Sequence, residues 1–250
     1  MLALGIFNSE VLVQRSRYFR TLLSPPSLSS AVDRIVRGAT LRFLSLAKPP
    51  VKGLGSAGKR SKEQQAAAKA FGIQAISSTP ADSLLAFTDG SAQGNPGPCG
   101  AGAHLVDKVF HGWAGSEAIG ALGHGSNNIG ELWAVGMALE LAAERLKSLP
   151  GAYTHLFIFI DSAYTVGCLD KSWRSKTNQC LVSAVRARIR VLRTFVEVHL
   201  VWVPAHVGIQ ENEHADFLAE KGSSLSEKGR ANVSLPLDPA SGFLPRRLSG

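Results

Sequence analysis

Two short apolar segments of this sequence each end in an aspartate: residues 84–89 read LLAFTD, and residues 156–161 read LFIFID. A continuous apolar run of this length is typical of a β-strand that is buried on both faces. If the two strands lie side by side and parallel, Asp89 and Asp161 meet at the carboxyl end of the sheet. Open α/β sheets bind ligands at that end. The two segments therefore point to both a fold class and a site.

The stretches around these segments alternate between strand and helix patterns. Residues 94–97 read GNPG, a turn signal, and glycines at 120, 123 and 125 indicate a loop. Further strands are predicted over 100–106, 109–113 and 196–203, the first two as a hairpin around Asp107 and Lys108, and helices over 128–149, 162–169, 178–195 and 210–221. Hairpins combined with crossover helices predict an α/β fold with a mixed five-stranded sheet flanked by helices.

Residues 1–79 differ from the rest of the chain in charge. They hold 12 Lys and Arg against 3 Asp and Glu, whereas residues 80–250 hold 15 against 16. The stretches SPPSLSS (24–30) and KPPVKGLGSAGKR (48–60) disfavour regular structure, and only a modest helix over 62–71 is indicated. We therefore predict a basic segment of low order (1–79), one folded domain (80–223) and a loose C-terminal tail (224–250).

The basic segment has three interpretations that its composition leaves open. An Arg-rich, acid-poor N-terminus suits a mitochondrial transit peptide, a nucleic-acid-binding arm or the remnant of a longer polyprotein. The three cysteines, Cys99, Cys168 and Cys180, are odd in number and widely spaced, which favours a reducing compartment over a disulfide framework. No apolar run is long enough to cross a bilayer. We expect an intracellular protein, in the nucleus or cytoplasm, with the mitochondrion as an alternative.

Carboxylates that converge at a sheet edge repel one another unless a cation neutralises them. Ligand sets made of oxygen alone favour Mg²⁺ or Mn²⁺ over zinc. Each acid also has a structural interpretation when it is taken singly. Asp161 can be a turn or N-cap residue, Glu131 can close a capping box with Asn128, and Asp216 can complement the dipole of the last helix. His206, in a loop after a predicted strand, is expected to be exposed.

These acids and His206 lie in four sequence blocks, and the four blocks together are far more specific than any single residue. They read FTDGSAQGNPGP (87–98), NNIGEL (127–132), IDSAYTVG (160–167) and WVPAHVGIQENEHADFLA (202–219). In these blocks the sequence resembles the type 1 ribonuclease H family, over essentially all of residues 81–222. The stretch VPAHVGIQENEHAD (203–216) also resembles the corresponding stretch of ribonuclease H domains attached to retroelement reverse transcriptases. The resemblance implies a ribonuclease H-like sheet and a hydrolase that cuts the RNA strand of RNA–DNA hybrids, largely without sequence preference.

The resemblance also implies roles for single residues. The metal-binding carboxylates would be Asp89, Glu131, Asp161 and Asp216, holding two Mg²⁺ ions with Mn²⁺ as an alternative, and His206 would assist turnover. The substrate-binding positions would be Gly90, Ser91, Asn95, Asn128 and Asn212, the last of which, with Glu213, looks structural as much as functional. The partner would be an RNA–DNA hybrid, with no membrane involved. The protein would be a monomer or part of a larger assembly of the reverse-transcriptase type.

Two departures from the family pattern concern substrate contact. Ala163 stands where many relatives carry a polar residue, and no Trp- and Lys-dense protrusion is evident. The nearest equivalent of this protrusion is formed by Trp173, Arg174 and Lys176. The arginines of the next helix suit either phosphate contacts or a solvated helix face: Arg186, Arg188, Arg190 and Arg193. A catalytically weak or inactive hybrid- or RNA-binding module derived from a retroelement is therefore the main alternative. A different nuclease or integrase-like protein of the wider fold is a weaker one.

Overall fold

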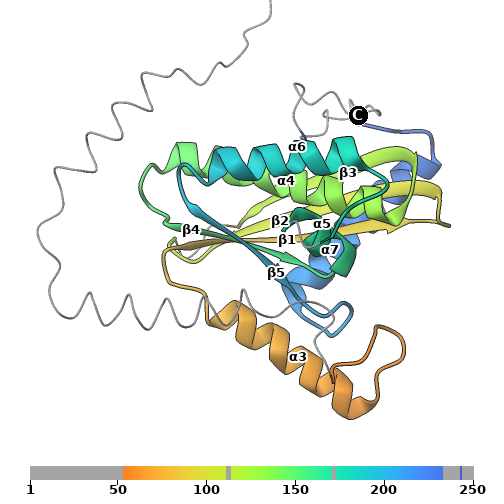
Figure 1. Ribbon diagram of the computed structural model, residues 1–250, viewed down its shortest axis with the longest axis horizontal. Helices are drawn as coiled ribbons and strands as arrows, with labels where there is room; N and C mark the ends of the chain where they lie inside the picture. Colours follow the sequence, from red (N-terminus) through yellow and green to blue (C-terminus); the bar gives the residue numbers. More distant parts are fainter. Residues whose placement is uncertain (1–52, 111–113, 171–172, 233–242, 244–250) are drawn as a thin grey trace, which may run out of the picture. The chain divides into compact units, whose positions relative to one another are not determined.

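The computed structural model describes residues 53–110, 114–170, 173–232 and 243. Its centre is a five-stranded sheet in the order β3-β2-β1-β4-β5 (Figure 1). The strands are β1 (Ser83–Ala92), β2 (Gly97–Asp107), β3 (Ser116–Gly125), β4 (His155–Ile160) and β5 (Glu197–Trp202). β1, β2 and β3 pair antiparallel, whereas β1 with β4 and β4 with β5 pair parallel. The predicted mixed α/β sheet is confirmed.

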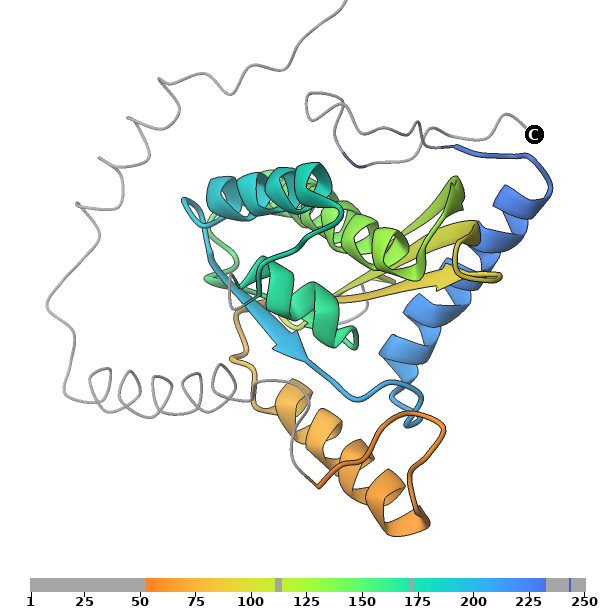
Figure 2. The same ribbon diagram turned by 45° about the vertical axis from the view of Figure 1, so that its right-hand side comes forward.

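Helices cover both faces of this sheet. The helices are α3 (Lys62–Ser77), α4 (Asn127–Ser148), α5 (Ala163–Leu169), α6 (Gln179–Leu192) and α7 (Gln210–Glu227). Figure 2 shows α4 and α6 on one face of the sheet and α7 on the other, where it lies along β1, β2 and β3. None of the helices in the described part of the chain combines the length and the apolarity that a membrane span requires.

The central strand β4 is buried along its whole length because both of its faces are covered. Ile158 packs in the main core with residues of α4, while Phe159 points to the opposite face and stacks on Phe87, with ring centroids 4.9 Å apart. In the parallel register, Thr88 pairs with Ile160. The residues that follow this pair, Asp89 and Asp161, are therefore neighbours at the carboxyl edge of the sheet.

The hairpin partner of β2 was predicted wrongly. Strand β3 spans Ser116–Gly125, not 109–113, of which residues 111–113 lie outside the described residues. The glycines that suggested a loop lie within the strand for different reasons: Gly123 has a φ of 74° where the register against β2 shifts, and Gly120 meets helix α7 through its carbonyl oxygen. A Cβ added at Gly222 of α7 would lie 2.4 Å from the carbonyl oxygen of Gly120.

The same contact explains why α7 does not stop before Gly222. The helix continues to Glu227, so Gly222 serves close packing and is not a helix terminator. Beyond it, the Asn232 side chain bonds to the backbone of β3, and its Oδ1 accepts from the Ala121 amide at 2.7 Å. Phe243 is buried against Trp133, whose indole N–H donates to the Phe243 carbonyl oxygen at 3.3 Å. The expectation of a loose tail is therefore wrong at these residues.

Helix α3 corrects the expectation of low order across residues 1–79, of which 1–52 lie outside the described residues. The helix extends to Ser77, beyond the predicted residue 71, and begins in a capping box formed by Ser61 and Gln64. Its Ala68 packs against Val207 and Ile209. The end of the basic segment is therefore part of the folded unit, because its small residues allow close contact with the loop before α7.

Candidate active site

Three carboxylates from separate elements meet at the carboxyl edge of the sheet. Asp89 lies in β1, Glu131 in the first part of α4, and Asp161 directly after β4. One oxygen from each lies within 4.8 Å of the others. Asp89 and Glu131 are only 5 % and 3 % exposed. These three residues are called the carboxylate cluster below.

Two glycines allow Glu131 to reach the cluster. A Cβ at Gly90 would lie 2.2 Å from the Glu131 amide nitrogen, and one at Gly130 would lie 2.4 Å from the Gly100 carbonyl oxygen. Strands β1 and β2 therefore both come into backbone contact with the start of helix α4. This contact gives Gly90, predicted to bind substrate, a packing role in the structure.

The capping interpretation of Glu131 is wrong. The N-cap of α4 is Ser126, not Asn128, and no side chain caps the helix there. The Asn127 side-chain amide donates to Glu131 Oε1 at 3.5 Å, while Oε2 is buried without a hydrogen-bond partner. Glu131 therefore faces the other carboxylates, where no capping role holds it.

Burial and mutual repulsion disfavour the charged forms of these acids. Burial, followed by the charges of Asp161 and Asp216, raises the pKa of Asp89 to about 9. Burial and the charges of Asp161 and Asp89 raise the pKa of Glu131 well above its usual value. Burial also raises the pKa of Asp161 to about 6, although the Asn212 hydrogen bond and the nearby His206 lower it. Such perturbed groups at a sheet edge are typical of functional sites.

The cluster fits a divalent cation. Its donor set is all oxygen, the buried Glu131 Oε2 lacks a partner, and one oxygen of each acid is already close to the others. A cation at this place would neutralise the repulsion that adds to burial in raising the pKa values of Asp89 and Glu131. Oxygen donors alone favour Mg²⁺ or Mn²⁺.

Asp216 and His206 complete the rim of the site. Asp216, in α7, is close enough to raise the pKa of Asp89, and its Oδ2 lies 3.5 Å from His206 Nδ1. The His206 side chain is 60 % exposed, as expected from the sequence, and its backbone has a φ of 51°. Glu213 Oε1 accepts from the Gly208 amide at 3.0 Å, which ties this loop to the start of α7.

Sequence reasoning missed the contacts that hold the His206 loop from outside. The Arg60 guanidinium donates to the Ala205 carbonyl oxygen at 2.7 Å, and the Gln65 side-chain amide donates to the His206 carbonyl oxygen at 2.8 Å. No motif signals these contacts, because the partners are more than 140 residues apart and the acceptors are backbone atoms.

The other predicted substrate-binding residues have mixed surroundings. Asn212 is buried and donates to Asp161 Oδ2 at 3.2 Å, so it orients a member of the cluster. Asn95 Oδ1 accepts from the Asn127 amide at 3.2 Å, and Ser91 Oγ lies 3.5 Å from Ser223 Oγ. Asn128 is half-buried in the first turn of α4, near the cluster.

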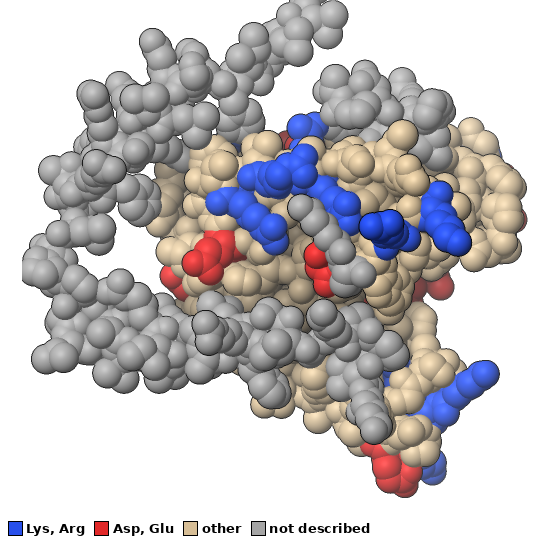
Figure 3. All heavy atoms as spheres, viewed as in Figure 1, with Lys and Arg blue, Asp and Glu red and all other residues tan. Residues whose placement is uncertain are grey.

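The arginines on and after α6 are partly engaged within the protein. Figure 3 shows Lys and Arg side chains gathered over this helix. Arg188 pairs with Glu140 at 2.9 Å, the Arg186 guanidinium donates to the Cys168 carbonyl oxygen, and Arg193 donates to the Val198 carbonyl oxygen at 3.3 Å. Arg190 is exposed. The surface of α6 is therefore compatible both with phosphate contacts and with a solvated helix face.

Known proteins with matching sequence cover the whole of this domain. The family model RNase H matches residues 81–224. A ribonuclease H from Dinoroseobacter shibae is 33 % identical over an alignment of 160 positions, which covers 60 % of this chain and 97 % of the relative. Among solved structures, RNase H1 from Halobacterium salinarum is 29 % identical, with a TM-score of 0.44, and covers 57 % of this chain and 98 % of its own. LC11-RNase H1, solved in complex with an RNA/DNA hybrid, is 24 % identical, with a TM-score of 0.46, and covers 58 % and 99 % of the two chains.

The matched segment contains every carboxylate of the site and the His206 loop. The match to the family model spans more than half of this chain, and the relative from Dinoroseobacter shibae is covered almost completely. The chain therefore belongs to the ribonuclease H family of hydrolases.

Proposed function

We propose that this protein is an endonuclease that hydrolyses the RNA strand of RNA–DNA hybrids, and that it does so with two divalent metal ions. The observation that carries this proposal is the carboxylate cluster, in which Asp89, Glu131 and Asp161 face one another and the charges of their neighbours raise the pKa values of Asp89 and Glu131 beyond the effect of burial. Membership of the ribonuclease H family supports the substrate class.

Asp89, Glu131, Asp161 and Asp216 would hold the ions. Bound Mg²⁺, or Mn²⁺, would lower the pKa of a water and stabilise the oxygen that leaves the scissile phosphate. The chain's own contribution is positional: Asn212 fixes the Asp161 carboxylate, and the contact of Gly90 with α4 holds Glu131 in place. His206 is exposed beside Asp216 and can hold or release a proton at its imidazole near the leaving group.

Substrate recognition would rest on the RNA strand itself and not on its base sequence. Asn95 and Asn128, with Gly90 and Ser91 nearby, border the site and would contact the RNA strand in the minor groove, where 2′-hydroxyls distinguish RNA from DNA. The exposed Arg190 and the basic residues before position 53 would add phosphate contacts, each of which steepens the salt dependence of binding.

A labelled RNA–DNA duplex incubated with Mg²⁺, and in parallel with EDTA, tests the activity. We expect cleavage of the RNA strand with Mg²⁺ alone and no cleavage of double-stranded RNA or DNA. Asp161→Asn is the matched variant and should bind hybrid without cutting it. Wild-type protein that shifts the hybrid without cleaving it would favour the alternative of an inactive hybrid- or RNA-binding module derived from a retroelement.

The role of the N-terminal segment and the cellular compartment of the protein are the subject of separate proposals. Deleting residues 1–52 leaves α3 in place and should weaken hybrid binding at physiological salt if the segment is a nucleic-acid-binding arm. Organelle import of a reporter fused to residues 1–60 would instead indicate a mitochondrial transit peptide. Retention of the reporter in the nucleus or cytoplasm would support those compartments. A retroelement origin would be supported by reverse-transcriptase sequence adjoining the gene.

A further inference from the structure

Three potential metal ligands converge at the end of the sheet opposite the carboxylate cluster. His155 begins β4, and Glu197 and His199 lie on β5. The parallel register pairs His155 with Glu197, and residues two apart in a strand point to the same face. His155 Nδ1 lies 3.3 Å from His199 Nε2, and each of these nitrogens lies 3.6 Å from Glu197 Oε2.

These spacings match those of a small tetrahedral ion. Zinc binds imidazole nitrogen and carboxylate oxygen at about 2.0–2.2 Å, so two of its ligand atoms lie roughly 3.3–3.6 Å apart. We propose that His155, Glu197 and His199 form a second metal site that takes Zn²⁺ through two imidazoles and one carboxylate. The site is called the histidine site below.

The surroundings orient the His199 imidazole and place charges of both signs near it. The ring of His199 stacks on Phe157 with centroids 4.4 Å apart, which fixes its direction. The Arg193 charge nearby opposes a cation, and the Glu197 carboxylate offsets it.

Exposure leaves an entry path on one side of the histidine site. The side chains of His155 and His199 are 11 % and 21 % exposed, whereas Glu197 is 67 % exposed. An ion can therefore arrive from the Glu197 side and keep a water in its fourth position, as zinc sites with three protein ligands do.

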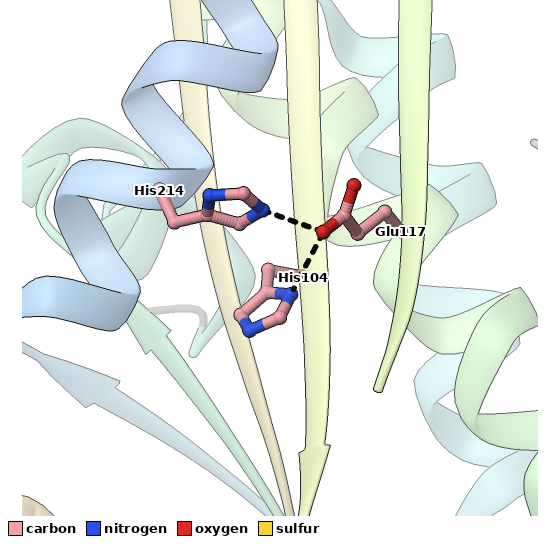
Figure 4. A group of neighbouring side chains, drawn as sticks. All are labelled: His104, Glu117 and His214. Atoms are coloured by element: carbon pink, nitrogen blue, oxygen red, sulfur yellow. Dashed lines mark hydrogen bonds and ion pairs between the residues drawn. The ribbon is translucent and has the colours of Figure 1, made fainter. Parts of the chain in front are cut away.

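A second group of two histidines and one glutamate serves as a comparison (Figure 4). There His214 Nε2 lies 2.6 Å from Glu117 Oε1, a direct hydrogen bond, while His104 Nδ1 lies 3.9 Å from the same oxygen. One pair is too close to share a tetrahedral ion and the other is too far apart. This group is therefore an ion-pair arrangement, and its residues provide matched control variants.

The histidine site is remote from the chemistry. His155 and Asp161 stand at opposite ends of β4, about 20 Å apart at the rise of a β-strand. A zinc ion at the histidine site would not touch the substrate of the carboxylate cluster. It would join β4 to β5, the last pair of the sheet, and would stabilise the fold by binding the native state alone.

Cobalt substitution tests the proposal on the full chain. Metal-free protein is titrated with Co²⁺ and then with Zn²⁺. Tetrahedral Co²⁺ with nitrogen ligands absorbs visible light strongly, whereas the all-oxygen carboxylate cluster favours octahedral coordination, which absorbs weakly. We expect one equivalent of strongly absorbing Co²⁺, displaced by Zn²⁺, in wild type and equally in Asp161→Asn, which alters only the carboxylate cluster.

Single-residue variants identify which side chains bind the strongly absorbing Co²⁺. His155→Gln and His199→Gln should each abolish the strong absorption, whereas His104→Gln should retain it. Glu197 is exposed, so Glu197→Gln should fold as wild type and weaken zinc binding at least tenfold, even if a histidine variant unfolds. Circular dichroism of the metal-free proteins checks the fold. A wild type without the strong absorption, or an absorption that survives His155→Gln or is lost in His104→Gln, overturns the proposal.

Discussion

Buried carboxylates occur at both ends of the sheet, and their surroundings are opposite. At the end of β2, Asp107 accepts hydrogen bonds from Arg145 at 2.7 Å and 3.2 Å, from the Tyr153 hydroxyl and from the amides of Val109 and Phe110. At the other end, Asp89 and its neighbours face acids of the same charge.

The two pKa directions follow from this difference. Burial acts to raise the pKa of Asp107, but the hydrogen bonds from Tyr153, Arg145 and the backbone outweigh it and leave the pKa below its usual value. The pKa of Asp89 is raised to about 9. A carboxylate such as Asp107, which is neutralised by its hydrogen-bond donors, stabilises the fold. A group of carboxylates that repel one another is instead expected to bind a cation. The contrast distinguishes Asp107 from the acids that we propose to hold metal ions, without reference to any relative.

The largest expected effect is on catalysis. Asp89→Asn should reduce Mg²⁺-dependent cleavage of hybrid by about 10³-fold or more, because losing one metal carboxylate removes several kcal/mol of transition-state stabilisation. The metal-free variant should melt at or above the wild-type temperature, since one repelling acid is gone. The measurement is hybrid cleavage beside a thermal melt. Wild-type cleavage by this variant would contradict the assigned site.

Asp107→Asn should show the reverse pattern. Breaking the buried pair with Arg145 should lower the free energy of unfolding by about 3 kcal/mol. Cleavage by the folded fraction should stay within a few-fold of wild type, because Asp107 is remote from the carboxylate cluster. Urea denaturation gives the first quantity and the hybrid assay gives the second. Equal loss of activity in Asp89→Asn and Asp107→Asn would contradict the expectation that only the carboxylate cluster takes part in cleavage.

Mg²⁺ should raise the free energy of unfolding through the carboxylate cluster and not through Asp107. At Mg²⁺ one hundredfold above its dissociation constant, the wild-type free energy of unfolding should rise by about 2.7 kcal/mol. Asp107→Asn should gain the same increment, and Asp89→Asn much less. Thermal or urea unfolding with and without EDTA measures all three proteins. An unchanged Mg²⁺ increment in Asp89→Asn would mean that the ion binds elsewhere.

The smallest effect concerns acid stability. Because the pKa of Asp107 is lowered on folding, its contribution is fully present above its ordinary pKa of about 4 and is lost as the pH falls through the folded value. In that window the unfolded state binds more protons. Asp107→Asn should therefore flatten the decline in stability below about pH 4, in urea titrations with EDTA. Asp89→Asn, as the control, should retain the decline.

Most of the sheet, and the convergence of the carboxylates at the candidate site, could be predicted because local sequence patterns encode them. The apolar runs that end in Asp89 and Asp161 identify β1 and β4, since a strand buried on both faces has few other sequences available to it. Strand β3 was missed because its glycines were interpreted as turn residues, whereas Gly120 lies in backbone contact with α7 and Gly123 lies at an irregularity of the strand pairing. A glycine pattern alone does not distinguish a bend from a backbone contact with a distant element.

The contacts that could not be predicted join residues far apart in the chain. Helix α3 meets the loop before α7 through Ala68 and Ile209, and its Ala-rich sequence has no strong apolar stripe to indicate a docked face. The histidine site likewise combines His155 with His199, which no short metal motif contains. Only the register of β4 against β5 brings these two rings together.

The way in which α3 holds the His206 loop has a consequence for variation in that loop. The side chains of Arg60 and Gln65 donate to the main-chain carbonyls of Ala205 and His206, so these two hydrogen bonds do not depend on the His206 side chain. A substitution such as His206→Ala would remove the imidazole yet leave the anchor in place. Conversely, a protein trimmed to the family boundary at residue 81 would keep the histidine and lose its support.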